Sequence, residues 1–277
     1  MITPINYYGS KFNMLPYIIP KIPPHRVYIE PFFGGGTVFF AKLKSHCEVI
    51  NDINDNVVNF FRVLQTNFAA LARLIEYSCN SRSMHKQTKI IYKNPSQYDE
   101  ITRAWAFWYQ SNVSFGNKVC NGGWAYGWNS NDNSHQGRVF ANRKKRVVLE
   151  LAKRMEDVQI ECADAIGLIK KSIHKDDIFF YLDPPYISAD MGHYKNTFSK
   201  EDFQELLKLL STAGAKFLLS SYKENILLEY RNKYDWNYFE IQQKVSIANK
   251  YKSKKSKIEC LTWNYKAPEQ ISLKFYK

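Results

Sequence analysis

The residues best suited to chemistry are Asp183, Pro184, Pro185 and Tyr186, which directly follow an apolar run at residues 178–182. That run predicts a buried strand of a parallel sheet. Two consecutive prolines end the strand, because neither can donate to a sheet ladder. A carboxylate, stiff backbone carbonyls and an aromatic ring are therefore expected at the C-terminal edge of the strand, where open α/β sheets bind ligands. Such a group can grip a flat base by its exocyclic amine.

A glycine-rich turn at residues 33–36 and the carboxylate of Asp52 form a second candidate site. Glycine lets the backbone approach a ligand closely, and a carboxylate after the next strand can accept hydrogen bonds from ribose hydroxyls. The turn lacks the full G-x-G-x-x-G spacing of dinucleotide sites, and the sequence has no P-loop lysine. The pattern favours a cofactor with a ribose but no pyrophosphate, such as S-adenosylmethionine.

Alternating strands and helices are predicted to position both groups. Apolar runs predict strands at residues 27–30, 48–50, 159–162, 178–182, 217–220, 238–245 and 259–265. Apolar residues at helical spacing predict helices from residue 37 and at residues 55–77, 96–110, 144–157 and 200–210, the first long one broken near Asn67. Strand, glycine turn, helix, strand and acid make the opening of a nucleotide-binding α/β unit.

The stretch at residues 80–145 interrupts this alternation. It holds the ring-rich helix expected at residues 96–110 and then a segment at residues 121–133 that is rich in glycine and asparagine, as ordered loops are. The stretch is therefore predicted to be an inserted lobe.

The composition points to a polyanionic partner. A formal net charge of +13 with 16% aromatic residues suits bases and phosphates together, and so favours nucleic acid over a charge that only keeps the protein soluble. The five cysteines are widely spaced without C-x-x-C, which favours reduced thiols in a cytoplasmic protein. The six histidines show no ligand spacing, so no metal is predicted. We find no signal peptide and no segment of membrane-spanning length.

Five short motifs occur in order along the chain: YYGSK at residues 7–11, EPFFGGG at 30–36, NDIN at 51–54, DPPY at 183–186 and ECLTWNY at 259–265. In these motifs the chain resembles the Dam-like, D12-class DNA adenine N6-methyltransferases. The resemblance implies an α/β fold, the Rossmann-like S-adenosylmethionine-dependent methyltransferase fold with an inserted, mainly helical target-recognition domain. It divides the chain into a catalytic α/β domain at residues 1–78 and 146–277 and a recognition domain at residues 79–145.

The resemblance also implies which residues bind S-adenosylmethionine. Phe33 and Gly34 would line the methionine end, Asp52 would hold the ribose and Asp164 would meet the adenine. The full set of cofactor residues is Tyr7, Lys11, Phe33, Gly34, Asp52, Asp164 and Asp183.

Asp183, Pro184 and Tyr186 would be the catalytic residues. The exocyclic amine of adenine is a poor nucleophile, because its lone pair is delocalised into the ring. Hydrogen bonds from its two N–H groups to the Asp183 carboxylate and the Pro184 carbonyl would favour a tetrahedral nitrogen with a localised lone pair. Tyr186 would stack on the base, which must be flipped out of the duplex. Related cytosine N4 enzymes often carry serine in place of the aspartate, so Asp183 favours adenine.

Several neighbouring residues have two interpretations. Ser220, Ser221 and Tyr222 end a strand on the same edge as Asp183, and they either face the base pocket or pack in the core. Tyr194 and Phe198 either cover the flipped base or pack against the protein.

Residues that bind DNA are expected in three places. Asn129 and Arg138 of the inserted stretch are candidates for contacts with base edges. The lysine-rich segment around Lys250, Lys252, Lys254 and Lys255 either contacts phosphates or is a solvated hairpin loop. A basic run at residues 143–146 is expected to begin a helix, where cations oppose the helix dipole and a phosphate would relieve that opposition.

These observations predict a site-specific DNA adenine N6-methyltransferase that uses S-adenosylmethionine, acts on double-stranded DNA and requires neither metal nor membrane. From the resemblance we expect a monomer, with a cognate restriction endonuclease, acting separately, as a further partner. Methylation of cytosine N4 or of RNA adenine stays open as an alternative. So does a catalytically silent nucleic-acid-binding module, although such a module has no use for Asp183 or the glycine turn.

Overall fold

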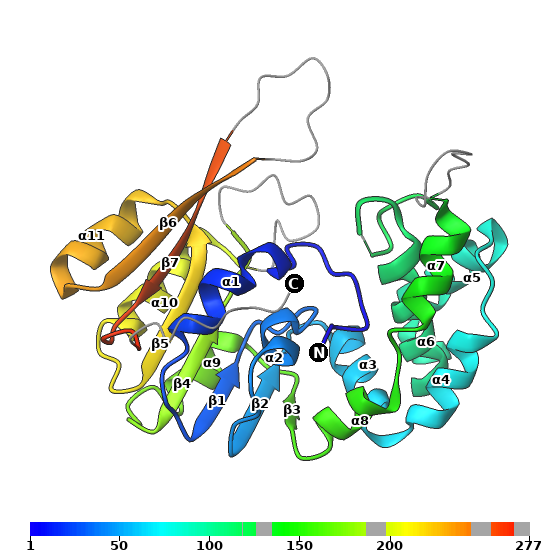
Figure 1. Ribbon diagram of the computed structural model, residues 1–277, viewed down its shortest axis with the longest axis horizontal. Helices are drawn as coiled ribbons and strands as arrows, with labels where there is room; N and C mark the ends of the chain where they lie inside the picture. The colour runs from blue at the N-terminus through cyan, green and yellow to red at the C-terminus, as the bar shows by residue number, and fades with distance from the viewer. Residues whose placement is uncertain (118, 126–134, 187–197, 245–255, 269–277) are drawn as a thin grey trace. The chain divides into compact units, whose positions relative to one another are not determined.

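A seven-stranded sheet with the strand order β3-β2-β1-β4-β5-β7-β6 is the framework of the protein (Figure 1). The structure is a computed structural model that describes residues 1–277 except 118, 126–134, 187–197, 245–255 and 269–277. The strands are β1 (Val27–Glu30), β2 (Cys47–Asn51), β3 (Gln159–Glu161), β4 (Ile178–Leu182), β5 (Lys216–Tyr222), β6 (Asn237–Lys244) and β7 (Ser256–Trp263). β4 is parallel to β1 and β5, whereas β7 is antiparallel to β5 and β6. The predicted Rossmann-like α/β fold is confirmed.

The parallel strands β1, β4 and β5 end at one edge of the sheet. Leu182, the last residue of β4, pairs with Leu219, and β5 continues beyond it to Tyr222. β7 begins near the same edge, where Glu259 pairs with Tyr222 in the antiparallel register. Asp183 and the end of β5 therefore lie at the same edge of the sheet as the first half of β7.

The chain divides into two compact units. Unit 1 comprises Met1–Leu15, Phe33–Leu43 and Ile50–Cys162, and unit 2 comprises Pro16–Phe32, Lys44–Val49 and Ala163–Lys277. Unit 1 thus contains the N-terminal segment, the glycine turn and the stretch at residues 80–145. Unit 2 contains β4, β5, β7 and the tetrapeptide after β4.

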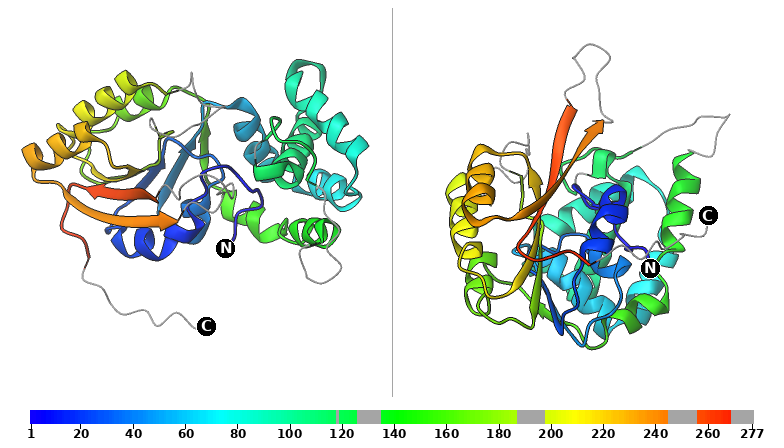
Figure 2. Two further views of the ribbon diagram at one scale, coloured as in Figure 1. Left: turned by 90° about the horizontal axis from the view of Figure 1, so that it is seen from above. Right: turned by 60° about the vertical axis from the view of Figure 1, so that its left-hand side comes forward.

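Three helices of unit 2 cover one face of its strands (Figures 1 and 2). They are α9 (Ala165–Lys170), α10 (Lys200–Leu210) and α11 (Asn225–Tyr234). Their apolar side chains form one buried cluster with Leu182 of β4 and Leu219 of β5. Because side chains alternate along a strand, Ser220 points to the other face. α10 begins at the predicted residue with a capping box between Ser199 and Asp202.

Helix α6 (Glu100–Val113) is the central helix of unit 1. It packs against three helices of the same unit, α3 (Asp55–Thr66), α4 (Phe68–Glu76) and α5 (Arg82–Lys93). Every residue of α6 from 104 to 113 is buried, and the buried Gln110 donates to the His85 carbonyl and the Thr88 hydroxyl. The other elements are α1 (Leu15–Ile18), α2 (Thr37–Ala41), α7 (Gln136–Lys144), α8 (Leu149–Met155) and 3₁₀ turns at Phe12–Met14, Ile19–Lys21, Pro95–Gln97 and Phe115–Asn117.

Two of the predicted helices differ in outcome. The one at residues 55–77 breaks at Asn67 as expected, because that residue leaves the helical region at φ −144° and ψ 45°. The one at residues 144–157 was wrong in its start, since α7 ends at Lys144 and Val148 is extended at φ −121° and ψ 156° before α8 begins. The helices α1, α5, α7, α9 and α11 were not predicted.

We predict that Gly36→Ala destabilises unit 1. Gly36 precedes α2 with φ +65°, and an added Cβ would meet the Phe33 ring at 2.5 Å. The strained backbone and the clash are expected to lower the free energy of unfolding by at least about 1 kcal/mol, measured by urea denaturation. The control is Gly123→Ala, because an added Cβ there meets nothing within 4 Å. Equal losses in the two variants would contradict this account.

Candidate active site

The tetrapeptide begins where β4 stops. All five residues of β4 are buried, and the strand ends at Leu182 as predicted. Pro184 is buried, whereas Asp183 and Tyr186 are half-buried. The two prolines supply carbonyl acceptors and no N–H donors, so the carboxylate of Asp183 lies in a segment dominated by acceptors. That arrangement suits a ligand that offers N–H donors.

Tyr186 is fixed by its hydroxyl group. Its oxygen lies 2.9 Å from Ser220 Oγ on β5, and it donates to Glu259 Oε1 on β7 at 3.1 Å. Burial, together with the charges of Asp183 and Glu259, raises the pKa of Tyr186 well above its ordinary value. The phenol therefore keeps its proton and donates to the carboxylate.

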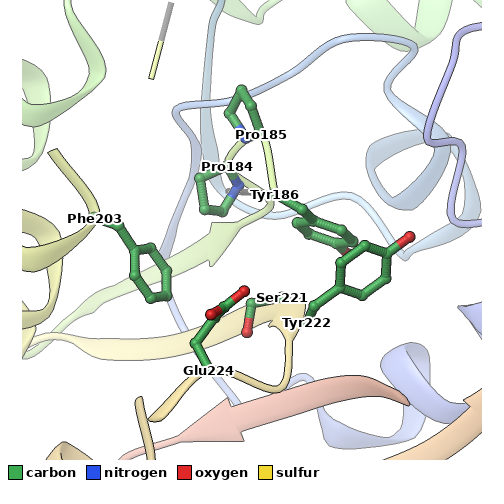
Figure 3. Close-up of a pocket in the computed structure, with 7 residues that line it drawn as sticks. All are labelled: Pro184, Pro185, Tyr186, Phe203, Ser221, Tyr222 and Glu224. Atoms are coloured by element: carbon green, nitrogen blue, oxygen red, sulfur yellow. The ribbon is translucent and has the colours of Figure 1, made fainter. Parts of the chain in front are cut away.

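A small pocket lies beside the tetrapeptide (Figure 3). Its volume of about 10 Å³ is room for about one water molecule. Among the residues that the structure describes, Ser221 Oγ and Glu224 Oε1 are buried polar atoms without a hydrogen-bond partner, and both residues line this pocket. The lining residues are Pro184, Pro185, Tyr186, Phe203, Ser221, Tyr222 and Glu224.

The structure resolves some of the open interpretations. Ser221 and Tyr222 face the pocket, and Ser220 faces the hydroxyl of Tyr186. Phe198 is partly buried and packs edge-on against Phe32, with 5.4 Å between ring centroids, at the margin of the core of unit 2. Tyr194 lies outside the described residues.

Asp52 is tied to the glycine turn of unit 1. Its carboxylate accepts the backbone N–H of Gly34 at 2.8 Å and that of Asn54 at 2.8 Å. Burial nevertheless raises the pKa of Asp52 to about 6, against the lowering effect of the two backbone hydrogen bonds. A carboxylate with this pKa can change its charge close to neutral pH.

The ring of Tyr7 packs on the glycine turn. An added Cβ on Gly34 or Gly35 would lie 3.0 Å from side-chain atoms of Tyr7, so glycine allows this close approach without displacing the tyrosine. Lys11 is 6% exposed and its Nζ donates to the Gly9 carbonyl at 2.9 Å. The ring of Phe33 packs in the core against Phe39 and Phe61, underneath Gly36 of the same turn.

The N-terminal segment that carries Tyr7 is anchored to α6. Trp108 Nε1 donates to the Pro4 carbonyl at 3.1 Å, and Asn6 Nδ2 donates to Asn112 Oδ1 at 2.9 Å. These contacts join the predicted cofactor residues of unit 1 to the stretch at residues 80–145.

The predicted site residues therefore form two groups. Within unit 1 the structure brings together Tyr7, Gly34 and Asp52 through the packing and the hydrogen bonds just described. Asp183, Pro184 and Tyr186 lie together in unit 2. Asp164 also belongs to unit 2, where it caps α9 by accepting the N–H of Gly167 at 2.7 Å.

The basic run at residues 143–146 does not begin a helix, so that prediction was wrong. Arg143 and Lys144 lie in the last turn of α7, where cations interact favourably with the helix dipole. Arg143 donates to the Asn112 carbonyl, and Lys144 donates to the carbonyls of Glu76 at 2.7 Å and Ser78 at 3.2 Å. These two cations tie α7 to the rest of unit 1.

The predicted DNA contacts are described only in part. Arg138 is exposed on α7. Asn129, Lys250, Lys252, Lys254 and Lys255 lie outside the described residues. Over the described ranges, no group of three or more His, Cys, Asp or Glu side chains is arranged to hold a metal ion, and no helix is both long and apolar enough to cross a bilayer.

Sequence inspection assigned no role to Glu259 or Glu224. Glu259 lies in the ECLTWNY motif, but nothing in the motif indicates its partner. In the same motif, Thr262 accepts from Arg231 and Asn264 bonds to the backbone of Phe217 and Ala215 beside β5. The polar residues of the motif therefore hold the hairpin of β6 and β7 against its neighbours.

Comparison with known proteins identifies the family. The profile of the D12 class N6 adenine-specific DNA methyltransferases matches residues 7–247. The Type II methyltransferase M1.LlaDCHI of Lactococcus lactis subsp. cremoris is 28% identical over 93% of each chain. The DNA N-6-adenine-methyltransferase of Escherichia phage P1 is 28% identical over 77% of this chain and 29% of its own length. The DNA adenine methylase of Vibrio cholerae is 26% identical over 66% of this chain and 64% of its own. Since the profile spans most of its length, the chain belongs to the D12 class N6 adenine-specific DNA methyltransferases.

Proposed function

We propose that the protein transfers a methyl group from S-adenosylmethionine to the exocyclic amine of a flipped-out adenine at a specific site in duplex DNA. The observation that carries the proposal is the tetrapeptide at the carboxyl edge of β4, in a chain of the D12 class. It combines a carboxylate, a proline carbonyl and a tyrosine whose hydroxyl is held by Ser220 and Glu259.

On the side of the target base, Asp183 and Pro184 hold the amine. The carboxylate of Asp183 and the carbonyl of Pro184 each accept one N–H, which keeps the nitrogen lone pair out of the ring system. Acceptors held in place stabilise the positive charge that develops on the nitrogen without having to reorganise. Tyr186 stacks on the extruded base, and such stacking offsets part of the cost of taking the base out of the duplex.

On the side of the cofactor, Asp52 holds the ribose hydroxyls, Tyr7 packs on the glycine turn, and Lys11 contacts the cofactor from the same N-terminal segment. The donor set fits S-adenosylmethionine: a half-buried carboxylate follows β2, a glycine turn allows close approach, and the buried ammonium of Lys11 suits a carboxylate. When bound, S-adenosylmethionine supplies an activated methyl group. Phe33 contributes its backbone, Asp164 contacts the adenine, and Asp183 completes the cofactor set.

The stretch at residues 79–145 is the proposed target-recognition domain. It contains ten Lys and Arg against three Asp and Glu, a net +7 out of the +13 of the whole chain. This concentration of positive charge in about a quarter of the residues favours contacts with DNA phosphates. Arg138 and Asn129 are proposed to contact bases, and Lys250, Lys252, Lys254 and Lys255 to contact phosphates.

The DNA substrate and five cysteines outside any disulfide favour a cytoplasmic enzyme. We further propose that it acts as a monomer and that a cognate restriction endonuclease is a separate protein.

We predict that Asp183→Ala abolishes methyl transfer without unfolding the protein, because the amine loses its charged acceptor. The wild type and the variant are incubated with S-adenosylmethionine labelled in its methyl group and unmethylated plasmid DNA, and the DNA is then digested to nucleosides. Label is expected in N6-methyladenine for the wild type, with a loss of at least about a hundredfold in the variant.

The matched control is Asp176→Ala, an exposed aspartate just before β4 at its other end, which is expected to leave transfer unchanged. Circular dichroism shows whether both variants are folded. Label in N4-methylcytosine, or transfer to RNA alone, would replace adenine in DNA as the substrate. No transfer by the wild type, with DNA binding retained, would favour the silent binding module. Full turnover by Asp183→Ala would contradict the assigned role.

We predict that cofactor binding weakens below about pH 6. The pKa of Asp52 is raised to about 6 by burial, so the carboxylate is ionised above this value and protonated below it. The ionised form accepts hydrogen bonds from both ribose hydroxyls, whereas the protonated form loses acceptor capacity. The dissociation constant of S-adenosylmethionine, measured by calorimetry, is therefore expected to be flat above pH 6 and to rise by up to tenfold per pH unit below it.

Asp52→Asn is the matched control for this measurement, because it keeps the shape of the side chain and removes the titrating group. It is expected to bind the cofactor more weakly and without the step near pH 6. A wild-type dissociation constant that stays constant from pH 5 to pH 7 would show that Asp52 does not hold the ribose through its charge.

A further inference from the structure

The hydroxyl of Tyr186 lies between two polar groups on other strands of unit 2. Ser220 Oγ on β5 is 2.9 Å away, and Glu259 Oε1 on β7 is 3.1 Å away. Ser220 is fully buried and Glu259 is 6% exposed. Glu259 follows Tyr186 in the chain by 73 residues, so this contact exists only because the sheet brings β7 to the edge where β4 ends.

The chemistry of the groups fixes the direction of the hydrogen bonds. An ionised carboxylate only accepts, so the O–H of Tyr186 donates to Glu259. The phenol oxygen is then left to accept the hydroxyl proton of Ser220. A hydrogen bond to a charged acceptor is among the stronger ones in proteins, and here it is removed from most solvent competition.

The support for Glu259 is rigid. β7 pairs with β5 on one side and with β6 on the other, and Glu259 itself lies in register with Tyr222 and Ile241. The ring of Tyr222 lies 4.3 Å from that of Tyr186, centroid to centroid (Figure 3). The ring of Tyr186 is thus fixed at its hydroxyl and against one neighbouring ring before any base is present.

We infer that Glu259 is a positioning residue for methyl transfer, which acts by holding Tyr186 in the orientation that stacks on the target adenine. This inference rests on the proposed function. A ring that is already oriented loses less conformational freedom when the base arrives, and the amine is held at the acceptors of Asp183 and Pro184 more often. The hairpin of β6 and β7 thereby supports the reaction from outside the tetrapeptide.

Two other roles for Glu259 give different results in one experiment. A role in overall stability would affect cofactor binding and transfer alike. A role through charge alone would be lost equally in Glu259→Gln and Glu259→Ala. A role through the hydroxyl of Tyr186 would be kept by glutamine, whose amide oxygen still accepts the O–H, and would vanish in a protein that lacks that hydroxyl.

The experiment measures four variants, Glu259→Ala, Glu259→Gln, Tyr186→Phe and the double variant Glu259→Ala with Tyr186→Phe. Each is assayed for kcat and KM with unmethylated plasmid DNA and labelled S-adenosylmethionine, and for the dissociation constant of the cofactor. The control is Glu240→Gln on β6 of the same hairpin, whose carboxylate pairs with Arg231 and Lys223 at 2.9 Å each. Circular dichroism reports whether each variant is folded.

We expect Glu259→Ala and Tyr186→Phe each to lower kcat by about tenfold or more, the range of one hydrogen bond to a charged group. The double variant is expected to be no slower than the worse single variant, because both changes remove the same hydrogen bond. Glu259→Gln is expected to keep kcat within about threefold of the wild type. The cofactor dissociation constant is expected to be unchanged throughout, and Glu240→Gln to match the wild type.

Three results would overturn the inference. They are a wild-type kcat in Glu259→Ala, losses that multiply in the double variant, and a loss in Glu259→Gln as large as that in Glu259→Ala. If Glu259→Ala does not fold, Tyr186→Phe alone decides, because a wild-type kcat without the hydroxyl leaves Glu259 nothing to act through. A wild type that methylates no DNA would instead defeat the proposed function, and the two failures are therefore distinct.

Discussion

Two adjacent prolines stop β4 in the middle of the parallel part of the sheet, and the rest of the site depends on that stop. β5 continues past Leu219, its last residue paired with β4, and ends at Tyr222. β4 therefore stops short of the edge that β5 reaches. Prolines bring carbonyl acceptors without N–H donors. The segment that follows β4 therefore offers mainly hydrogen-bond acceptors, and the first of them is the carboxylate of Asp183. An amine with two N–H groups has the complementary pattern, and a ligand that needed donors from the protein would find few there.

The edge of β4 is acidic in a chain that is strongly basic overall. Glu30, Asp183 and Glu259 lie among the tyrosines Tyr28, Tyr181 and Tyr186, and Tyr28 donates to Glu30 at 2.6 Å. Burial and these carboxylates raise the pKa values of all three phenols well above their ordinary range. The phenols therefore keep their protons, and Tyr28 donates to Glu30 and Tyr186 to Glu259 without neutralising these carboxylates. The positive charge is concentrated elsewhere in the sequence, with a net +7 in residues 79–145. Such a separation suits the proposed function, in which one segment attracts DNA phosphates and another holds an amine that becomes positively charged.

The sequence predicts those features of the structure that depend on residues close together in the chain. β4 at residues 178–182 and α10 at residues 200–210 agree with the prediction at both ends, because an apolar run, two prolines and a capping serine are local signals. The orientation of a side chain is not local. Phe33 belongs to a motif that the resemblance links to the cofactor, yet its ring packs in the core on Phe39 and Phe61.

Contacts across the fold escaped prediction for the same reason. The partner of Glu259 is 73 residues away in the chain, and no pattern in the ECLTWNY motif points to Tyr186. The basic run at residues 143–146 was placed at a helix start because apolar residues recur at helical spacing after it; Arg143 and Lys144 in fact lie in the last turn of α7 and donate to backbone carbonyls within unit 1. Charge alone therefore does not identify the cations that meet DNA.

The contacts of helix α6 also could not be predicted from the sequence. Its residues 104–113 are buried, and Trp108 and Asn112 bond to the segment that carries Tyr7. The helix therefore supports that segment, and in the proposed function base contacts would come from exposed residues of the stretch, such as Arg138 on α7. The predicted domain boundary between residues 78 and 79 divides the chain by its sequence motifs. In the structure, the residues on both sides of it belong to the compact unit 1.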